Sequence, residues 1–289
     1  MGAILEIKDM GIRFGGLIAL EDVTIDVPEW EIVGLIGPNG AGKTTLFNCV
    51  TGLYQPNTGT VKHRDKDISL LPTHRRVARG IGRTFQNIGL VRGLTVLENC
   101  MVAQHSRIGY GATSGLFGAP RSFAEEHRLK QNAMEVLDFF DLTPLANAHL
   151  DGLPYGTLKL IEIATVLATD PDVLLLDEPS SGMGPDEAHA LGERLLELRK
   201  MLNLTMLMIE HHVPLVVGVC DFVYVLNFGK VLTSGKPQEV QNHPEVIAAY
   251  LGGEVPGEDG DGDGAEAGAS DTSTDDATRP IERAADGSA

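Results

Sequence analysis

Residues 37–44 read Gly-Pro-Asn-Gly-Ala-Gly-Lys-Thr, and this stretch decides the fold class. It fits the pattern G-x-x-x-x-G-K-[ST]. It stands between an apolar run at 31–36, which predicts a strand, and residues 43–50, which predict a helix. Glycines let successive backbone N–H groups turn inward, and the helix N-terminus adds a partial positive charge. The stretch therefore predicts a phosphate-binding loop between a strand and a helix.

Other strands and helices are expected on both sides of this loop. Apolar or alternating runs predict strands at 3–10, 23–27, near 60–61, 173–176, 205–209 and 222–226. Residues 185–202 predict a helix, and 91–160 a mainly helical segment interrupted by a Gly-rich stretch at 109–120. Because strands that alternate with helices form parallel sheets, we expect an α/β protein with a largely parallel sheet and an inserted helical subdomain.

The phosphate loop and a second motif carry the candidate chemistry. Lys43 would reach the β- and γ-phosphates of a nucleotide, and the Thr44 hydroxyl would hold Mg²⁺. The run Val-Leu-Leu-Leu-Asp-Glu at 173–178 is an apolar strand that ends in two carboxylates. Asp177 is expected to orient Mg²⁺ or its waters, and Glu178 to polarise an attacking water as general base.

The charge distribution gives no reason to expect a nucleic-acid partner. The net charge is −17, and segment 254–289 holds 11 of the 40 acidic and 2 of the 23 basic residues, which leaves −8 on the rest. Nucleic-acid affinity depends on Lys and Arg that neutralise phosphates, so an acidic body disfavours such a partner. Segment 254–289 has only Val255 and Ile281 as large aliphatic residues, and we expect it to be a disordered tail beside a folded domain at 1–253.

The cysteines and the N-terminal residues indicate in which cellular compartment the protein is expected. Cys49, Cys100 and Cys220 are scattered without CxxC spacing, which argues against a disulfide framework or a zinc site and favours a reducing cytosol. The start MGAILEIKDM lacks a basic region followed by an apolar one, and no apolar run approaches the roughly 20 residues that span a bilayer. Membrane association is therefore expected to come through a partner.

With both motifs in place, residues 4–253 resemble the ATP-binding-cassette (ABC) ATPases. The resemblance implies a P-loop NTPase core with a largely parallel sheet, an antiparallel β region near the N-terminus and a helical subdomain at about 91–160. It implies ATP and Mg²⁺ as cofactors, with Phe14 stacking on the adenine. The other nucleotide-binding residues that it implies are Gly37, Pro38, Asn39, Gly40, Ala41, Gly42, Lys43, Thr44 and Thr45.

Two further segments match the family by their order around these motifs. The run Arg-Thr-Phe-Gln at 83–86 resembles the segment that carries the family's Q-loop glutamine. By resemblance Gln86 would contact Mg²⁺ and the lytic water and sense a permease. The run Ile-Glu-His at 209–211 resembles the family's switch segment, so His211 would contact the γ-phosphate.

The signature segment departs from the family pattern. Where the family usually reads Leu-Ser-Gly-Gly-Gln, this chain has Leu-Pro-Tyr-Gly-Thr at 153–157. Gly156 keeps a backbone N–H near a helix N-terminus for a γ-phosphate, whereas Pro154 offers neither hydroxyl nor N–H. In the following loop, residues 180–184, Gly184 stands where many relatives have an acidic residue. Both departures resemble the subfamily that serves branched-chain amino-acid importers, although Pro154 and Thr157 are unusual even there.

The resemblance implies a peripheral subunit on the cytoplasmic face of the cell membrane. Its partners would be integral membrane permeases, a second ATPase subunit that is either a paralogue or another copy, and indirectly an extracytoplasmic solute-binding protein. The favoured function is an ATPase that energises uptake of branched-chain or related amino acids. An ATPase of the same branch that drives urea or amide import or lipid-linked export is the alternative, and a non-transport ABC protein is a third hypothesis.

Overall fold

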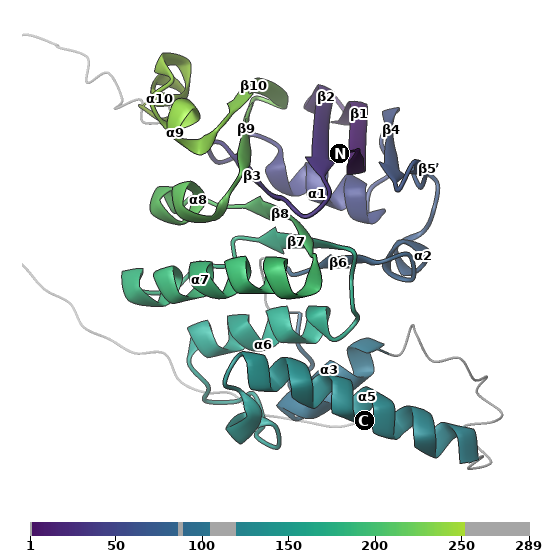
Figure 1. Ribbon diagram of the computed structural model, residues 1–289. Helices are drawn as coiled ribbons and strands as arrows, with labels where there is room; N and C mark the ends of the chain where they lie inside the picture. Colours follow the sequence, from purple (N-terminus) through teal and green to yellow (C-terminus); the bar gives the residue numbers. More distant parts are fainter. Residues whose placement is uncertain (1, 86–88, 105–119, 252–289) are drawn as a thin grey trace, which may run out of the picture. The chain divides into compact units, whose positions relative to one another are not determined.

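The computed structural model describes residues 2–85, 89–104 and 120–251 (Figure 1). Its strands are β1 (Ala3–Phe14), β2 (Leu17–Pro28), β3 (Ile32–Ile36), β4 (Thr58–His63), β5 (Lys66–Asp67), β6 (Ile81–Arg83), β7 (Val173–Asp177), β8 (Thr205–Ile209), β9 (Phe222–Asn227) and β10 (Lys230–Gly235). Its helices are α1 (Lys43–Thr51), α2 (Thr73–Val77), α3 (Val96–Ala103), α5 (Pro120–Phe139), η2 (Thr143–Leu145), α6 (Tyr155–Leu167), α7 (Pro185–Leu202), α8 (Val213–Val219), α9 (Pro237–Gln241) and α10 (Pro244–Leu251).

The larger sheet has the strand order β10-β9-β3-β8-β7-β6. All neighbouring strands in it run parallel except β9 and β10, which form an antiparallel hairpin. Parallel neighbours need long crossovers, and here helices supply them. The predicted largely parallel sheet is confirmed, and β3 lies inside it, so the phosphate loop leaves the sheet from an interior strand.

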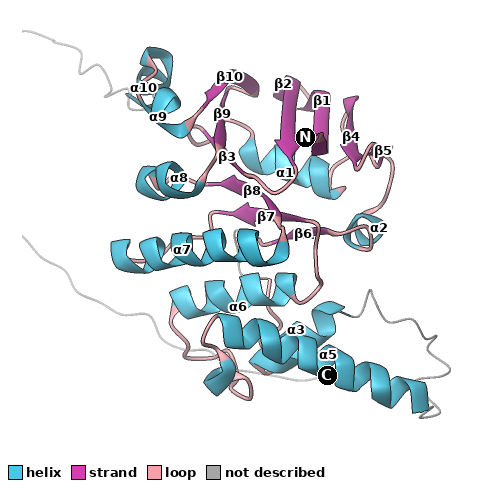
Figure 2. Cartoon of the chain, in the orientation of Figure 1, coloured by secondary structure: helices cyan, strands magenta, loops and turns pink. Residues whose placement is uncertain are grey.

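The smaller sheet is antiparallel, with the order β2-β1-β4-β5. Strands β1 and β2 are longer than their apolar runs indicated, because pairing in a hairpin extends each strand into polar residues. The antiparallel β region expected near the N-terminus is confirmed. Figure 2 shows it beside α1, which follows the phosphate loop.

The core lies on both faces of the larger sheet. Alternate residues of β7 and β8 face opposite ways: Leu175 and Leu207 pack with α1 and the antiparallel sheet, whereas Leu174 and Met206 pack with α6 and α7. Because both faces are covered, these strands are continuously apolar, as parallel strands usually are. This packing holds the carboxyl ends of the strands, where the motifs lie, at fixed positions.

The segment 91–160 contains α3, α5, η2 and the first part of α6. A capping box starts α3: Thr95 Oγ1 accepts the Glu98 N–H at 3.2 Å, and Glu98 Oε2 accepts the Thr95 N–H at 2.8 Å. Helix α6 continues to Leu167, past the predicted end of the helical segment, because its apolar face keeps packing on the core. The Gly-rich stretch at 109–120 lies outside the described residues except for Pro120, which begins α5.

The described residues, 2–85, 89–104 and 120–251, belong to one compact unit. The expected tail at 254–289 lies outside the described residues, and its disorder stays a prediction. No helix in the part of the chain that the structure describes is long and apolar enough to cross a membrane. The three cysteines, Cys49, Cys100 and Cys220, are free and buried.

Candidate active site

The phosphate loop, residues 37–44, connects β3 to α1, and the Lys43 side chain forms hydrogen bonds within the loop. The Lys43 ammonium donates to the carbonyl oxygens of Gly37 at 2.6 Å and Pro38 at 2.9 Å. Burial lowers the pKa of Lys43, and the Glu178 and Asp177 carboxylates oppose that shift. A Cβ atom on Gly37, whose φ is 150°, would lie 2.0 Å from the Leu226 carbonyl oxygen. Only glycine therefore fits where the strand turns into the loop.

Asp177 ends β7 and is almost completely buried. Its Oδ2 atom accepts a hydrogen bond from Arg83 Nη2 at 2.8 Å, and its backbone N–H donates to Thr84 Oγ1 at 3.1 Å. Its Oδ1 atom is buried with no hydrogen-bond partner. One carboxylate oxygen is thus fixed by an arginine, whereas the other is left available for a further ligand.

Glu178 and His211 meet directly. Glu178 Oε1 lies 3.0 Å from His211 Nε2, and the Glu178 N–H donates to the Ile209 carbonyl at 3.0 Å. Glu178 has a φ of 49°, which a non-glycine residue adopts only where its surroundings impose it. The strand ends of β7 and β8 therefore place a carboxylate and an imidazole in hydrogen-bond contact at the edge of the sheet.

A cleft of about 400 Å³ brings residues of the phosphate loop together with Glu178, His211 and Phe14, the residue expected to stack on adenine. Phe14 stands at its rim, 46% exposed, with its ring edge-on to Tyr54 at a centroid distance of 5.2 Å. An exposed aromatic face of this kind can stack on a base. The residues that line the cleft are Phe14, Leu17, Ile18, Ala19, Asn39, Gly40, Ala41, Gly42, Lys43, Thr44, Thr45, Glu178 and His211.

Gly156 does not line this cleft. It lies in the first turn of α6, where a Cβ atom would lie 3.6 Å from Glu187 and 3.7 Å from Met183. Pro154 is the N-cap residue of α6 and makes no side-chain capping bond. The Tyr155 ring fills the space beside Gly182, where a Cβ atom would come within 2.6 Å of it. The signature segment thus packs against the loop at 180–184 of its own chain.

Gln86 lies outside the described residues, but both flanks of its segment are visible. The buried Lys159 donates to the Phe85 carbonyl at 2.9 Å and pairs with Glu162 Oε2 at 3.3 Å. Glu162 Oε1 accepts the N–H groups of Phe85 at 2.9 Å and Gly89 at 3.2 Å. The helix that begins with the signature segment therefore holds the backbone on both sides of residues 86–88.

The donor set near the phosphate loop is of the kind that Mg²⁺ prefers. Asp177 provides a buried carboxylate oxygen without a partner, and Thr44 places a hydroxyl group at the start of α1. The described residues hold no group of three or more His, Cys, Asp and Glu side chains that would bind a metal alone. Mg²⁺ with few protein ligands completes its shell with water and substrate phosphates. The residues present therefore fit a Mg²⁺–nucleotide complex.

Sequence reasoning missed three residues that shape this site. Arg83 binds Asp177, Tyr54 contacts Phe14, and Glu210 accepts hydrogen bonds from Ser180, His211 and His212. For Glu210 a signal existed, because it is a charged residue directly after the run at 205–209, which is expected to be a buried strand. Arg83 ends β6, for which the sequence predicted no strand. Nothing in the sequence singled out Tyr54.

Comparisons with known proteins identify the relatives of this chain. A family model described as "ABC transporter" matches residues 20–181, and one described as "Branched-chain amino acid ATP-binding cassette transporter" matches residues 230–256. The high-affinity branched-chain amino acid transport ATP-binding protein LivG of Salmonella typhimurium is 43% identical over 86% of this chain and 98% of its own. BraF of Pseudomonas aeruginosa, described in the same words, is 41% identical over the same shares. A crystal structure of the ADP conformation of an ATP-binding cassette has a TM-score of 0.76 at 32% identity and covers 87% of this chain and 100% of that one.

Proposed function

This chain belongs to the ABC transporter family, and we propose that it is the ATP-hydrolysing subunit that energises uptake of branched-chain or related amino acids through partner permeases. The cleft supports this function best, because it unites a phosphate loop, a stacking surface and a carboxylate–imidazole pair. The identity of the cargo is inferred from similarity, because LivG and BraF, both named for branched-chain amino acid transport, match this chain along nearly their whole length.

The proposed binding step uses the phosphate loop. The Lys43 ammonium, now held by two loop carbonyls, would turn to the β- and γ-phosphates, while N–H groups of the loop and of α1 hold the other phosphate oxygens. Phe14 stacks on the adenine. Residues 37–42 and Thr45 would enclose the phosphates.

Hydrolysis is assigned to Glu178 and His211. Glu178 takes the proton of the attacking water as general base. His211, whose Nε2 lies 3.0 Å from Glu178 Oε1, donates to the γ-phosphate from the neighbouring strand end. Gln86 is proposed to contact the lytic water and the metal, and this role rests on the family resemblance alone. Mg²⁺, when bound, would neutralise charge that develops on the phosphates, and Thr44, Asp177 and Gln86 would hold it.

The assembly is proposed from the family as well. Two ATPase subunits, paralogues or two copies of this chain, would enclose each nucleotide between the phosphate loop of one and Gly156 of the other. The ATPase domain at 1–253 would sit at the cytoplasmic face of the membrane, bound to integral membrane permeases that receive cargo from an extracytoplasmic solute-binding protein. ATP drives closure because it binds the closed state better than the open one.

Uptake of labelled leucine, isoleucine and valine by cells that lack this chain tests the proposal. Wild-type chain should restore uptake, and Glu178→Gln should not, although it is made in equal amount. Labelled urea serves as the control cargo. Restored uptake of urea but not of the amino acids would assign this ATPase to the alternative cargo.

A further inference from the structure

Glu210 is a buried carboxylate that no part of the proposed mechanism uses. It follows β8 directly, is 2% exposed, and forms no ion pair within 4 Å with any residue that the structure describes. A buried charge is costly unless hydrogen bonds satisfy it. Glu210 therefore needs hydrogen-bond donors, and it lies beside the catalytic pair, Glu178 and His211.

Four donors from two separate loops satisfy Glu210. Its Oε1 atom accepts the Ser180 N–H at 2.9 Å and the Ser180 hydroxyl at 2.6 Å. Its Oε2 atom accepts the N–H groups of His211 at 2.8 Å and His212 at 3.1 Å. An ionised carboxylate has about four acceptor positions, so all of them are in use.

The contacts of Glu210 fall next to both members of the catalytic pair. On one side it fixes the backbone of His211, and on the other it fixes Ser180, two residues after Glu178. The His211 side chain is 36% exposed and has Glu178 as a partner. Its position therefore depends mainly on its backbone and on that one contact. Glu178 also holds a positive φ, which the surrounding structure must impose.

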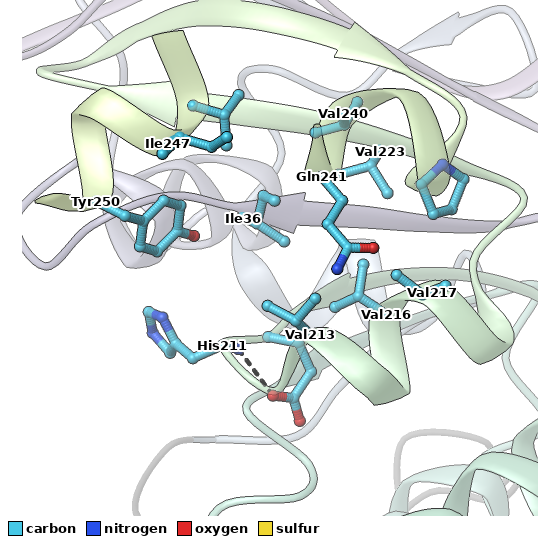
Figure 3. Close-up of a pocket in the computed structure, with 13 residues that line it drawn as sticks. Ile36, His211, Val213, Val216, Val217, Val223, Val240, Gln241, Ile247 and Tyr250 are labelled. Atoms are coloured by element: carbon cyan, nitrogen blue, oxygen red, sulfur yellow. Dashed lines mark hydrogen bonds between the residues drawn. The ribbon is translucent and has the colours of Figure 1, made fainter. Parts of the chain in front are cut away.

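The environment of Glu210 strengthens these bonds. Glu210 and His211 line a cavity of about 250 Å³ whose other walls are mainly apolar, with Val213, Val216 and Val223 among them (Figure 3). Hydrogen bonds to a charged group are stronger where the local dielectric is low. Because Glu210 is buried and bonded on both sides, it is a rigid connection between the two loops.

We infer that Glu210 is a positioning residue for ATP hydrolysis: it joins the loop at 180–184 to the His211 segment, so that Glu178 and His211 keep their contact and move together. The inference rests on the proposed ATPase function. It also gives the loop at 180–184 a physical route to His211, because any displacement of Ser180 must move or break the bonds of Glu210.

The test is a double-mutant cycle on the full chain with Mg-ATP as substrate. Glu210→Gln keeps the size of the side chain, but its NH₂ group cannot accept the hydrogen bonds that one of the two carboxylate oxygens now accepts. Since a displacement of about 1 Å can cost on the order of 100-fold in rate, we expect kcat to fall about 10- to 100-fold. The Kd for ATP, set by the phosphate loop, should change less than about 3-fold.

Coupling to His211 separates positioning from a merely structural role. If Glu210 acts through His211, adding Glu210→Gln to His211→Ala should lower kcat by less than about 3-fold further. Ser180→Ala removes only the hydroxyl bond, so it should give a smaller loss with the same non-additivity, and it serves if Glu210→Gln fails to fold. Asp67→Asn is the matched control, since Asp67 Oδ1 accepts the N–H of Ser69 at 2.8 Å and its hydroxyl at 2.6 Å, away from the cleft. It should leave kcat unchanged.

Three results would overturn the inference. They are a kcat for Glu210→Gln within about 3-fold of wild type, losses that multiply fully in the double variants, or an equal loss in Asp67→Asn. A wild-type chain without any ATPase activity would overturn the proposed function and this inference with it. An active wild type with additive losses rejects the inference alone.

Discussion

Replacing Arg83 by methionine should destabilise the protein strongly, because Arg83 satisfies a buried carboxylate. The Arg83 side chain is 6% exposed and Asp177 is 1% exposed, with 2.8 Å between Nη2 and Oδ2. Arg83 Nη1 also donates to Asn48 Oδ1 at 2.7 Å, and its guanidinium lies 5.4 Å from the centroid of the Phe47 ring. Methionine keeps the apolar stem between these groups and removes the charge and the donors.

The expected magnitude follows from the state in which Asp177 is left. Its Oδ1 atom already has no partner, so without Arg83 both oxygens of a buried carboxylate are unpaired. Breaking a buried ion pair by removing one partner costs about 3–5 kcal/mol. For a domain of this size, where 1 kcal/mol shifts Tm by about 2–4 °C, that corresponds to a fall of about 6–20 °C.

Chemical unfolding of Arg83→Met and wild type in urea, without nucleotide, measures the difference in unfolding free energy. Arg128→Met is the control, because Arg128 pairs with Glu125 at 2.6 Å while 62% exposed. An exposed pair of this kind contributes little to stability, because water screens the two charges. If Arg83→Met unfolds within about 1 kcal/mol of wild type, the Arg83–Asp177 pair does not satisfy a buried charge as described.

Four further outcomes are expected. Lys43→Ala should abolish productive ATP binding, because the polyphosphate loses its main point charge; near-normal ATPase activity in the assembled transporter would refute the site. Glu178→Gln should bind ATP normally but hydrolyse it about 10²- to 10⁴-fold more slowly and form an ATP-stabilised dimer in light scattering, whereas unchanged turnover would mean that another group is the base. Pro154→Ser, made in the Glu178→Gln protein, should tighten ATP-dependent association by about 10- to 150-fold, since a hydroxyl bond to a charged phosphate is worth about 1.5–3 kcal/mol; equal or weaker association would show that the proline is a structural choice. A thiol reagent at pH 8 should label no cysteine in the folded chain and all three after denaturation. Burial raises the pKa of the Cys49 thiol to about 11 and that of Cys220 to about 12, and it also raises the pKa of Cys100. Fast labelling of the folded chain would contradict this prediction.

Local patterns were sufficient for much of the fold. The helix predicted at 185–202 and the strand predicted at 205–209 have the same bounds in the structure. The helix has an unbroken period and a proline at its start, and the strand is one continuous apolar run. Short or half-exposed elements were missed, among them β6 (Ile81–Arg83) and α8 (Val213–Val219). Three to seven residues contain too little periodicity, and these elements exist because neighbouring strands and helices pair with them.

Some residues of the site could also be predicted from local patterns, whereas others could not. The sequence by itself determined the phosphate loop and the Asp177–Glu178 pair, because the residues of each motif are contiguous and their geometry follows from one strand, turn or helix. Only the tertiary structure decided that Arg83 binds Asp177, 94 residues away, and that Glu210 binds Ser180, 30 residues away. Such contacts depend on which strand ends are adjacent in the sheet, and strand order is set by packing of the whole core and leaves no local pattern in the chain.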